Sequence, residues 1–220
     1  MRTSLRSFFL LMAFSFALTA CSSKPSGESN SAPPAKPELK PTDAETGRVA
    51  LQRLYTTSRG WAGDTLPVSL QSQNYKNAGG NPDAPLGHDG KSAVWRGVFA
   101  SDSRRSMKTY MWSGLTGPDA PSPGINPGNE DAFAPGNIST RPFQLTYLKS
   151  DSDQVLETAQ KHGGAALVKK NADLPVNFSL SWDSRRSMLV WHVLYGKSSN
   201  EPDLDVVVDA TTNQFVHVEK

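Results

Sequence analysis

The hexamer Asp-Ser-Arg-Arg-Ser-Met occurs twice in this chain, at 102–107 and at 183–188. On both sides of each copy, apolar and aromatic residues alternate with polar ones, as in two strands joined by a polar turn. Two identical hexamers in a chain of 220 residues indicate an internal duplication. The sequence therefore predicts a β-hairpin in each half of the chain and a shared plan for the two halves.

The first 20 residues are predicted to be an export signal that is not part of the fold. Arg2 and Arg6 provide a positively charged start, and residues 8–17 are almost entirely apolar. This apolar run is shorter than the ~20 residues that a membrane-spanning helix needs. We therefore expect this segment to be cleaved and removed.

The end of this segment, Leu18-Thr19-Ala20-Cys21, resembles the lipobox of bacterial lipoproteins. The resemblance implies that Cys21 carries lipid, becomes the first residue of the mature chain and holds the protein on the membrane. Ser22 in the next position implies an outer-membrane location, facing the periplasm. Cys21 is the only cysteine, so no disulfide forms within the chain.

Four regions follow from these patterns: the signal at 1–20, a disordered tether at 21–41, and two folded units at 42–149 and 150–220. The tether is rich in Pro, Ser and Lys and has too few large apolar residues to form a core. The first unit is predicted to begin with a helix capped by Thr42, because Glu45 has capping-box spacing.

The rest of the first unit is predicted to hold one hairpin between long connections. The helix should end near Gly60, and the hairpin should span 94–112 around the first hexamer. Residues 71–92 and 115–138, rich in Gly, Asn and Pro, are predicted to be loops, with a strand resuming at 143–147.

The second unit is predicted to be one helix followed by four antiparallel strands. Asp151 and Gln154 have capping-box spacing, and the helix they begin should end at Gly163-Gly164. The strand at 189–193 reads Leu-Val-Trp-His-Val, and residues 206–216 read as a final hairpin around Asp-Ala-Thr-Thr-Asn.

These last segments resemble a PepSY domain, whose closing hairpin typically has hydrophobic residues, Asp-Ala, a turn and a returning strand. The resemblance covers about 150–220, with 42–149 as a more diverged copy. It implies a non-catalytic, secreted or membrane-anchored module, and some such domains are inhibitory pro-regions of peptidases. The expected fold class is α+β, with two repeated helix-plus-antiparallel-sheet (PepSY/cystatin-like) units packed into one domain.

The sequence argues against an enzyme, a metal and a cofactor. The histidines, at 88, 162, 192 and 217, lack metal-ligand spacing, and there is no Gly-x-Ser-x-Gly motif. His192 is the one candidate base, and we expect it to be a hydrogen-bonded structural residue. Nucleic acid is also excluded as a partner, because loss of Arg2 and Arg6 takes the formal charge from +2 to zero.

Two functions remain. The favoured prediction is a membrane-anchored cell-envelope lipoprotein that acts as a non-catalytic protein-interaction or inhibitory module toward an envelope protein. The alternative is a binder of anionic envelope polymer, peptidoglycan or lipopolysaccharide, through the paired arginines Arg104, Arg105, Arg185 and Arg186. Against the alternative, the hexamers also read as soluble turns whose Asp and Ser cap the backbone and whose arginines are solvated.

Overall fold

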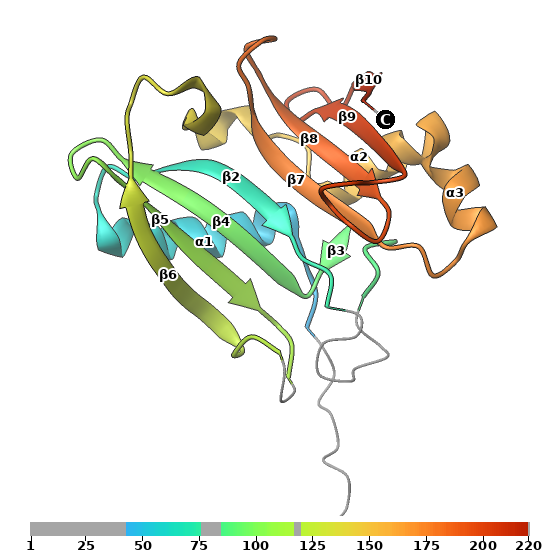
Figure 1. The fold of residues 1–220 in the computed structure, drawn as a ribbon, viewed down its shortest axis with the longest axis horizontal. Helices are drawn as coiled ribbons and strands as arrows, with labels where there is room; N and C mark the ends of the chain where they lie inside the picture. The colour runs from blue at the N-terminus through green and yellow to red at the C-terminus, as the bar shows by residue number, and fades with distance from the viewer. Residues whose placement is uncertain (1–42, 76–84, 117–119, 220) are drawn as a thin grey trace, which may run out of the picture. The chain divides into compact units, whose positions relative to one another are not determined.

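A computed structural model of the protein describes residues 43–75, 85–116 and 120–219. The predicted signal, lipobox and tether, including Cys21, lie outside these residues. In the described part, the chain forms one large antiparallel sheet with helices packed on one of its faces (Figure 1). All the described residues belong to one compact unit.

The sheet has eight strands, and every neighbouring pair is antiparallel. Across the sheet the strands are β10 (Phe215–Val218), β9 (Leu204–Asp209), β8 (Met188–Tyr195), β7 (Val176–Asp183), β2 (Leu66–Ser72), β4 (Val94–Ser101), β5 (Ser106–Ser113) and β6 (Gly124–Ala132). Two short strands, β1 (Glu45–Thr46) and β3 (Lys91–Ser92), form a separate pair.

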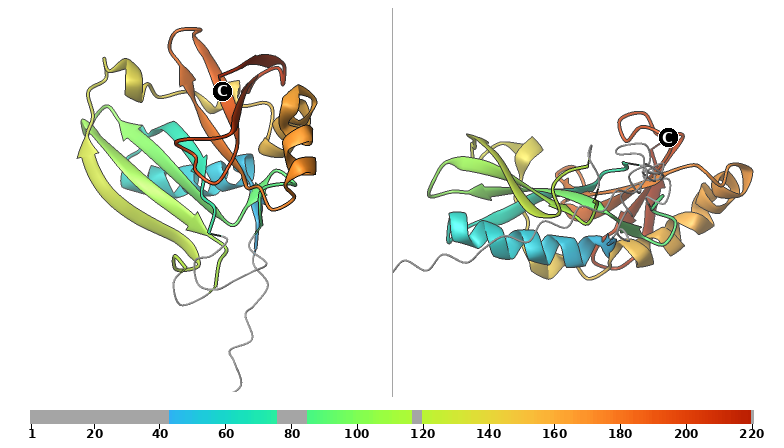
Figure 2. Two further views of the ribbon diagram at one scale, coloured as in Figure 1. Left: turned by 45° about the vertical axis from the view of Figure 1, so that its right-hand side comes forward. Right: turned by 90° about the horizontal axis from the view of Figure 1, so that it is seen from below.

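The helices cover a single face of the sheet, as Figure 2 shows from the side. α1 (Gly47–Trp61) packs against β2, β4 and β5. α2 (Ser152–Ala159) packs against β8 and β9 and continues through a kinked turn, η4 (Gln160–Gly164), into α3 (Ala165–Lys170). Two 3₁₀ turns, η2 (Ile138–Thr140) and η3 (Leu145–Tyr147), lie in the connection between the two halves.

The hydrophobic core lies between these helices and the sheet. Trp95 and Trp191 meet near its centre, with ring centroids 6.4 Å apart and an edge-to-face angle of 70°. α1 comes so close to them that a Cβ added to Gly47 would lie 2.5 Å from the Trp191 ring. The helix therefore has to begin with glycine at this contact.

The predicted fold class is wrong. The strands of the two halves form one continuous sheet that dominates the fold, so there are no two repeated helix-plus-sheet units. The reason is β2, which pairs with β7 on one side and β4 on the other. In the first half, the sheet strands β2 and β4 precede the hexamer turn, whereas in the second half only β7 does, so the halves do not share a plan.

Three local predictions in the connections are also wrong. The expected loop at 115–138 contains β6, an edge strand, where Pro127 needs no ladder partner on its outer side. The strand expected at 143–147 is instead the turn η3. The helix expected to stop at Gly163-Gly164 passes through a kink, where Gly163 has φ 111°, and continues to Lys170.

The start of α1 depends on residues from the other half of the chain. Its N-cap is Thr46, not Thr42, and the Thr46 side chain makes no capping hydrogen bond. Instead, Gly47 N–H donates to Ser152 Oγ and Arg48 N–H donates to Asp151 Oδ1, both at 2.8 Å. The first N–H groups of the helix, which have no partner within it, are thus bonded to acceptors that no local sequence pattern reveals.

Both hexamers form the predicted hairpin turns, but at different positions. The loop residues are 102–105 in the first copy and 184–187 in the second, so the chain turns one residue later. The fourth loop residue has positive φ in each case, 53° at Arg105 and 54° at Ser187.

Asp64 explains the first turn and gives a testable pH effect. Its carboxylate accepts bonds from Ser101 Oγ at 2.6 Å and from Ser103 N–H at 2.8 Å. These bonds lower the pKa of Asp64 to about 2. Because the folded-state pKa is below the ordinary 3.8, the stabilisation is complete above about pH 4 and is lost as the pH falls through about 2.

We expect the Asp64 carboxyl carbon to titrate in NMR spectra with a midpoint near pH 2, and we expect Ser101→Ala to move that midpoint toward 3.8. The Ser101 hydroxyl bond is the largest cause of the shift, so its loss has the largest effect. A wild-type midpoint at the ordinary value would show that Asp64 does not hold this turn.

Candidate functional site

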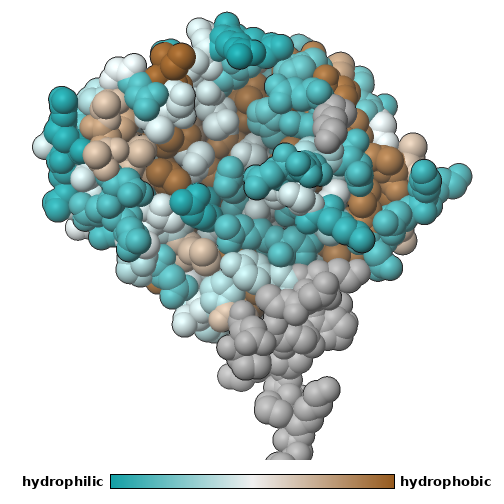
Figure 3. Space-filling model, viewed as in Figure 1, coloured by the Kyte–Doolittle hydropathy of each residue, from teal (hydrophilic) through white to brown (hydrophobic). Residues whose placement is uncertain are grey.

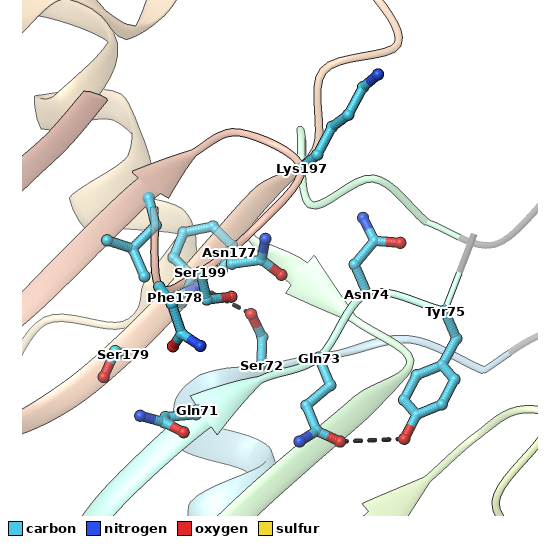
Figure 4. Close-up of a pocket in the computed structure, with 12 residues that line it drawn as sticks. Gln71, Ser72, Gln73, Asn74, Tyr75, Asn177, Phe178, Ser179, Lys197 and Ser199 are labelled. Carbon is cyan, nitrogen blue, oxygen red and sulfur yellow. Dashed lines mark hydrogen bonds between the residues drawn. The ribbon is translucent and has the colours of Figure 1, made fainter. Parts of the chain in front are cut away.

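A polar cavity lies where β2 and β7 separate. The two strands pair through only three residue pairs, the last being Gln71 with Ser179. Beyond this point, Phe178 N–H donates to the side chain of Ser72 at 2.8 Å, and β2 stays with β4 through a bond from Gln73 N–H to Val94 O. The cavity between the diverging chains has a volume of about 430 Å³ (Figure 4).

The cavity opens on the face of the sheet opposite the helices. Phe178 and Leu180 point into the core beneath the helices, so the alternate residues Asn177 and Ser179 point to the other face. Figure 1 looks onto this face, with α1 behind the sheet. In the same view, Figure 3 shows hydrophilic residues over most of the surface, between separate hydrophobic patches.

Carboxamides and hydroxyls make up most of the cavity lining. Carboxamides both donate and accept hydrogen bonds, and so do hydroxyls. Among the described residues that line the cavity, only Lys197 is charged. The lining residues are Gln71, Ser72, Gln73, Asn74, Tyr75, Asn177, Phe178, Ser179, Leu194, Lys197, Ser199 and Asn200.

Asn177 is the most informative residue of this site. It is only 3% exposed, and its side chain makes no hydrogen bond to another residue that the structure describes. Figure 4 shows its amide directed across the cavity toward Asn74. Because the Asn177 side chain lines the cavity and an amide can both donate and accept hydrogen bonds, it is positioned to bond a group that enters the cavity.

The four predicted arginines lie at one end of the sheet, since β4 and β7 both run antiparallel to β2. Two of them are already engaged. Arg186 pairs with Asp183 at 2.8 Å, and Arg104 donates to the carbonyl of Trp61 at 3.3 Å and lies 5.3 Å from the centre of its ring. The other two, Arg105 and Arg185, are exposed.

Carboxylates surround these arginines and reduce the positive field. Asp64 and Asp102 lie at the first turn, and Glu130 lies beside it, accepting a bond from Trp61 Nε1 at 2.6 Å. Two further cations lie here: Arg141 is stacked 4.9 Å from the ring of Trp182, and Lys108 pairs with Glu130 at 3.5 Å. Positive and negative groups are thus mixed at this end, which is unlike the concentrated positive charge that attracts an anionic polymer.

His192 lies on β8, on the same face as the cavity, opposite Ser179 in the strand pairing. Its Nδ1 is 3.0 Å from Asp205 Oδ2, so it has the hydrogen bond expected of a structural histidine. Burial lowers the pKa of His192, but the hydrogen bond and negative charge of Asp205, helped by Glu219, outweigh it and raise the pKa overall.

The sequence did not reveal the cavity, because its two walls are about 100 residues apart in the chain. Residues 71–75 read as the start of a loop, and 177–179 as ordinary strand alternation. Residues 87–91, Gly-His-Asp-Gly-Lys, form a turn between these segments: Gly87 and Gly90 have φ of 81° and 76°, and His88 Nε2 lies 2.7 Å from Leu174 O.

No protein-family model, no curated protein and no solved structure matches this chain. The lipobox and the resemblance of 150–220 to PepSY domains therefore stay predictions. Among the residues that the structure describes, no helix is long and apolar enough to cross a membrane.

Proposed function

We propose that this protein is a lipid-anchored protein of the cell envelope that binds a protein partner, without catalysis, through the cavity between β2 and β7. The membrane attachment rests on the lipobox at Cys21. The binding role rests on one observation above all: Asn177, a residue only 3% exposed, lines the cavity with an amide that makes no hydrogen bond to another described residue.

The chemistry of the lining favours a peptide as the bound group. A peptide backbone offers a donor and an acceptor at nearly every residue, which matches side-chain amides well. Lys197 adds one cation, suited to an acidic side chain or a terminal carboxylate. The inhibitory role implied by the PepSY resemblance would be one form of such binding.

The second candidate, an anionic polymer held by the paired arginines, has one observation in its favour. All four arginines lie at the same end of the sheet. The ion pair of Arg186 with Asp183 and the nearby carboxylates weigh against it, because they offset the charge that a polymer would need. We therefore place this function behind the first.

The direct test is photo-crosslinking in intact cells with a photoreactive amino acid at Gln71. Gln52 is the matched control, because it is also an exposed glutamine but lies on α1, behind the sheet. We expect a discrete protein adduct from position 71 and none from position 52. Equal adducts at both positions, or glycan in place of protein, would contradict the proposal.

Asn177→Ala tests the same site by a loss of affinity. We expect the adduct at position 71 to fall roughly tenfold, since a buried group of the partner would lose a hydrogen bond worth about 1–3 kcal/mol. The unfolding midpoint should hardly change, because this side chain makes no hydrogen bond to another described residue that the substitution could remove. The binding of an anionic polymer is favoured instead if the adduct at position 71 is kept in Asn177→Ala but lost when Arg104, Arg105, Arg185 and Arg186 are all changed to Ala.

A further inference from the structure

A second polar cluster lies on the helix-free face, at the β10 edge of the sheet. It consists of His192 on β8, Asp205 on β9, and His217 and Glu219 at the end of β10. The cavity does not include these residues. We call this group the edge cluster.

The strand register brings the edge cluster together. His192 pairs with Val207, and Val207 pairs with His217, so the two histidines lie in one row across three strands. Asp205 is two residues from Val207 and therefore points to the same face. Glu219 is held beside it, because Glu219 N–H donates to the carbonyl of Asp205 at 3.0 Å.

The side-chain atoms converge to distances that suit a bound ion. One ligand atom from each of His192, Asp205 and Glu219 lies within 4.8 Å of the other two, and the His192 Nδ1 to Asp205 Oδ2 distance is 3.0 Å. In a tetrahedral zinc site with bonds of 2.0–2.2 Å, ligand atoms are about 3.3–3.6 Å apart. Only small side-chain movements would therefore place all three around one ion.

We infer that His192, Asp205 and Glu219 form a binding site for a divalent transition-metal ion such as Zn²⁺. An imidazole with two carboxylates suits zinc-class ions, whereas calcium and magnesium prefer oxygen ligands alone. The site is reachable from solvent, since the Glu219 side chain is 50% exposed and that of His192 22%. Three protein ligands leave one tetrahedral position for water or for an atom of a bound molecule.

His217 acts in this site as a positioning residue. Its Nε2 lies 3.3 Å from Glu219 Oε1, and no other described side chain is hydrogen-bonded to that carboxylate. A hydrogen bond to a metal-binding carboxylate fixes its direction, and loss of such a partner typically lowers metal affinity by about 10–100-fold. Loss of His217 should therefore weaken binding without abolishing it.

The test is calorimetric titration of the metal-free full chain, purified in detergent without a histidine tag, with Zn²⁺ as the probe. We expect one ion per chain. His192→Ala and Asp205→Asn should each weaken binding by more than about a hundredfold, and His217→Ala by about tenfold. Circular dichroism of each variant shows whether the fold is kept.

His162→Ala is the matched control, because His162 stacks on Phe215 at 3.7 Å in the helical layer. It should bind Zn²⁺ like the wild type. Cys21→Ser should also do so, which excludes a thiol site outside the described residues.

Cobalt in place of zinc provides a spectroscopic check, since a folded variant that has lost the site should lose the visible bands of bound Co²⁺. Binding that is absent in the wild type, or unchanged by His192→Ala, would overturn the inference and leave only a structural His–Asp pair. Neither outcome bears on the crosslink at Gln71, so the two proposals fail separately.

Discussion

Replacing Gly90 by alanine is expected to lower the free energy of unfolding by about 3 kcal/mol or more. Gly90 has φ 76°, a conformation that strains any residue with a Cβ. An added Cβ would also lie 2.3 Å from Cα and 2.6 Å from N of Asp153, which are backbone atoms of α2. Either the turn or the start of α2 has to move.

The movement would also break a buried hydrogen-bond chain. Gly47 N–H donates to Ser152 Oγ, and Ser152 Oγ donates to Gly90 O at 2.6 Å. Ser152 is fully buried, so displacement of Gly90 leaves polar groups without partners at the junction of the two helices.

Urea unfolding of Gly90→Ala and of Gly60→Ala provides the measurement and its control. Gly60 lies inside α1, and an added Cβ there meets nothing within 4 Å. We expect Gly60→Ala to stabilise the protein by about 0.5–1 kcal/mol, because alanine favours helix more than glycine does. Similar effects at both positions would show that the Gly90 turn is not packed as described.

Replacing Trp191 by alanine is expected to lower the free energy of unfolding by about 3–5 kcal/mol. Trp191 is fully buried, its Nε1 donates to Ser150 O at 3.1 Å, and its ring supports the first residue of α1 at Gly47. The substitution would leave a cavity between both helices and the sheet, and it would orphan a buried carbonyl.

The comparison for this variant is Trp61→Ala, measured by the same urea titration. Trp61 is only partly buried, at the end of α1, where Arg104 and Lys108 approach its ring. Trp61→Ala should lower the free energy of unfolding clearly less than Trp191→Ala does, because less apolar surface returns to water. Equal costs would contradict the assignment of Trp191 to the centre of the core.

The two faces of the sheet have different chemistry. The helical face carries the large apolar side chains, including Trp95, Trp191 and Phe178. The opposite face carries both polar groups for which we propose binding: the cavity with Asn177 and the edge cluster with His192. Substitutions on the helical face should therefore act mainly on stability, and those on the opposite face mainly on binding.

Much of the local structure could be predicted from the sequence. The capping box of Asp151 and Gln154 is confirmed, as are the hairpin predicted over 94–112 and the closing turn, where Asn213 has φ 59°. Each of these depends on residues that are close in sequence, so their pattern carries the information.

The candidate sites could not be predicted in the same way. Gln71 and Asn177 line one cavity only because β2 pairs with β7, and Asp205 and Glu219 meet only through the register of β9 and β10. His192 was singled out from its residue type, but its partners were not. Pairing between distant strands depends on which faces can be buried together, and no short pattern encodes that choice.

The two hexamers separate what the sequence alone determined from what the tertiary structure decided. Six identical residues between alternating strands were enough to determine a hairpin turn in each half. The tertiary structure decided at which residues of each copy the chain turns. In the first copy, the carboxylate of Asp64, from another segment, accepts a hydrogen bond from the turn backbone. In the second copy, the acceptor is Asp183, which belongs to the hexamer and accepts from the backbone N–H groups of Arg185 and Arg186. A turn is a local structure, but the acceptors for its donors come from whatever the fold places beside it.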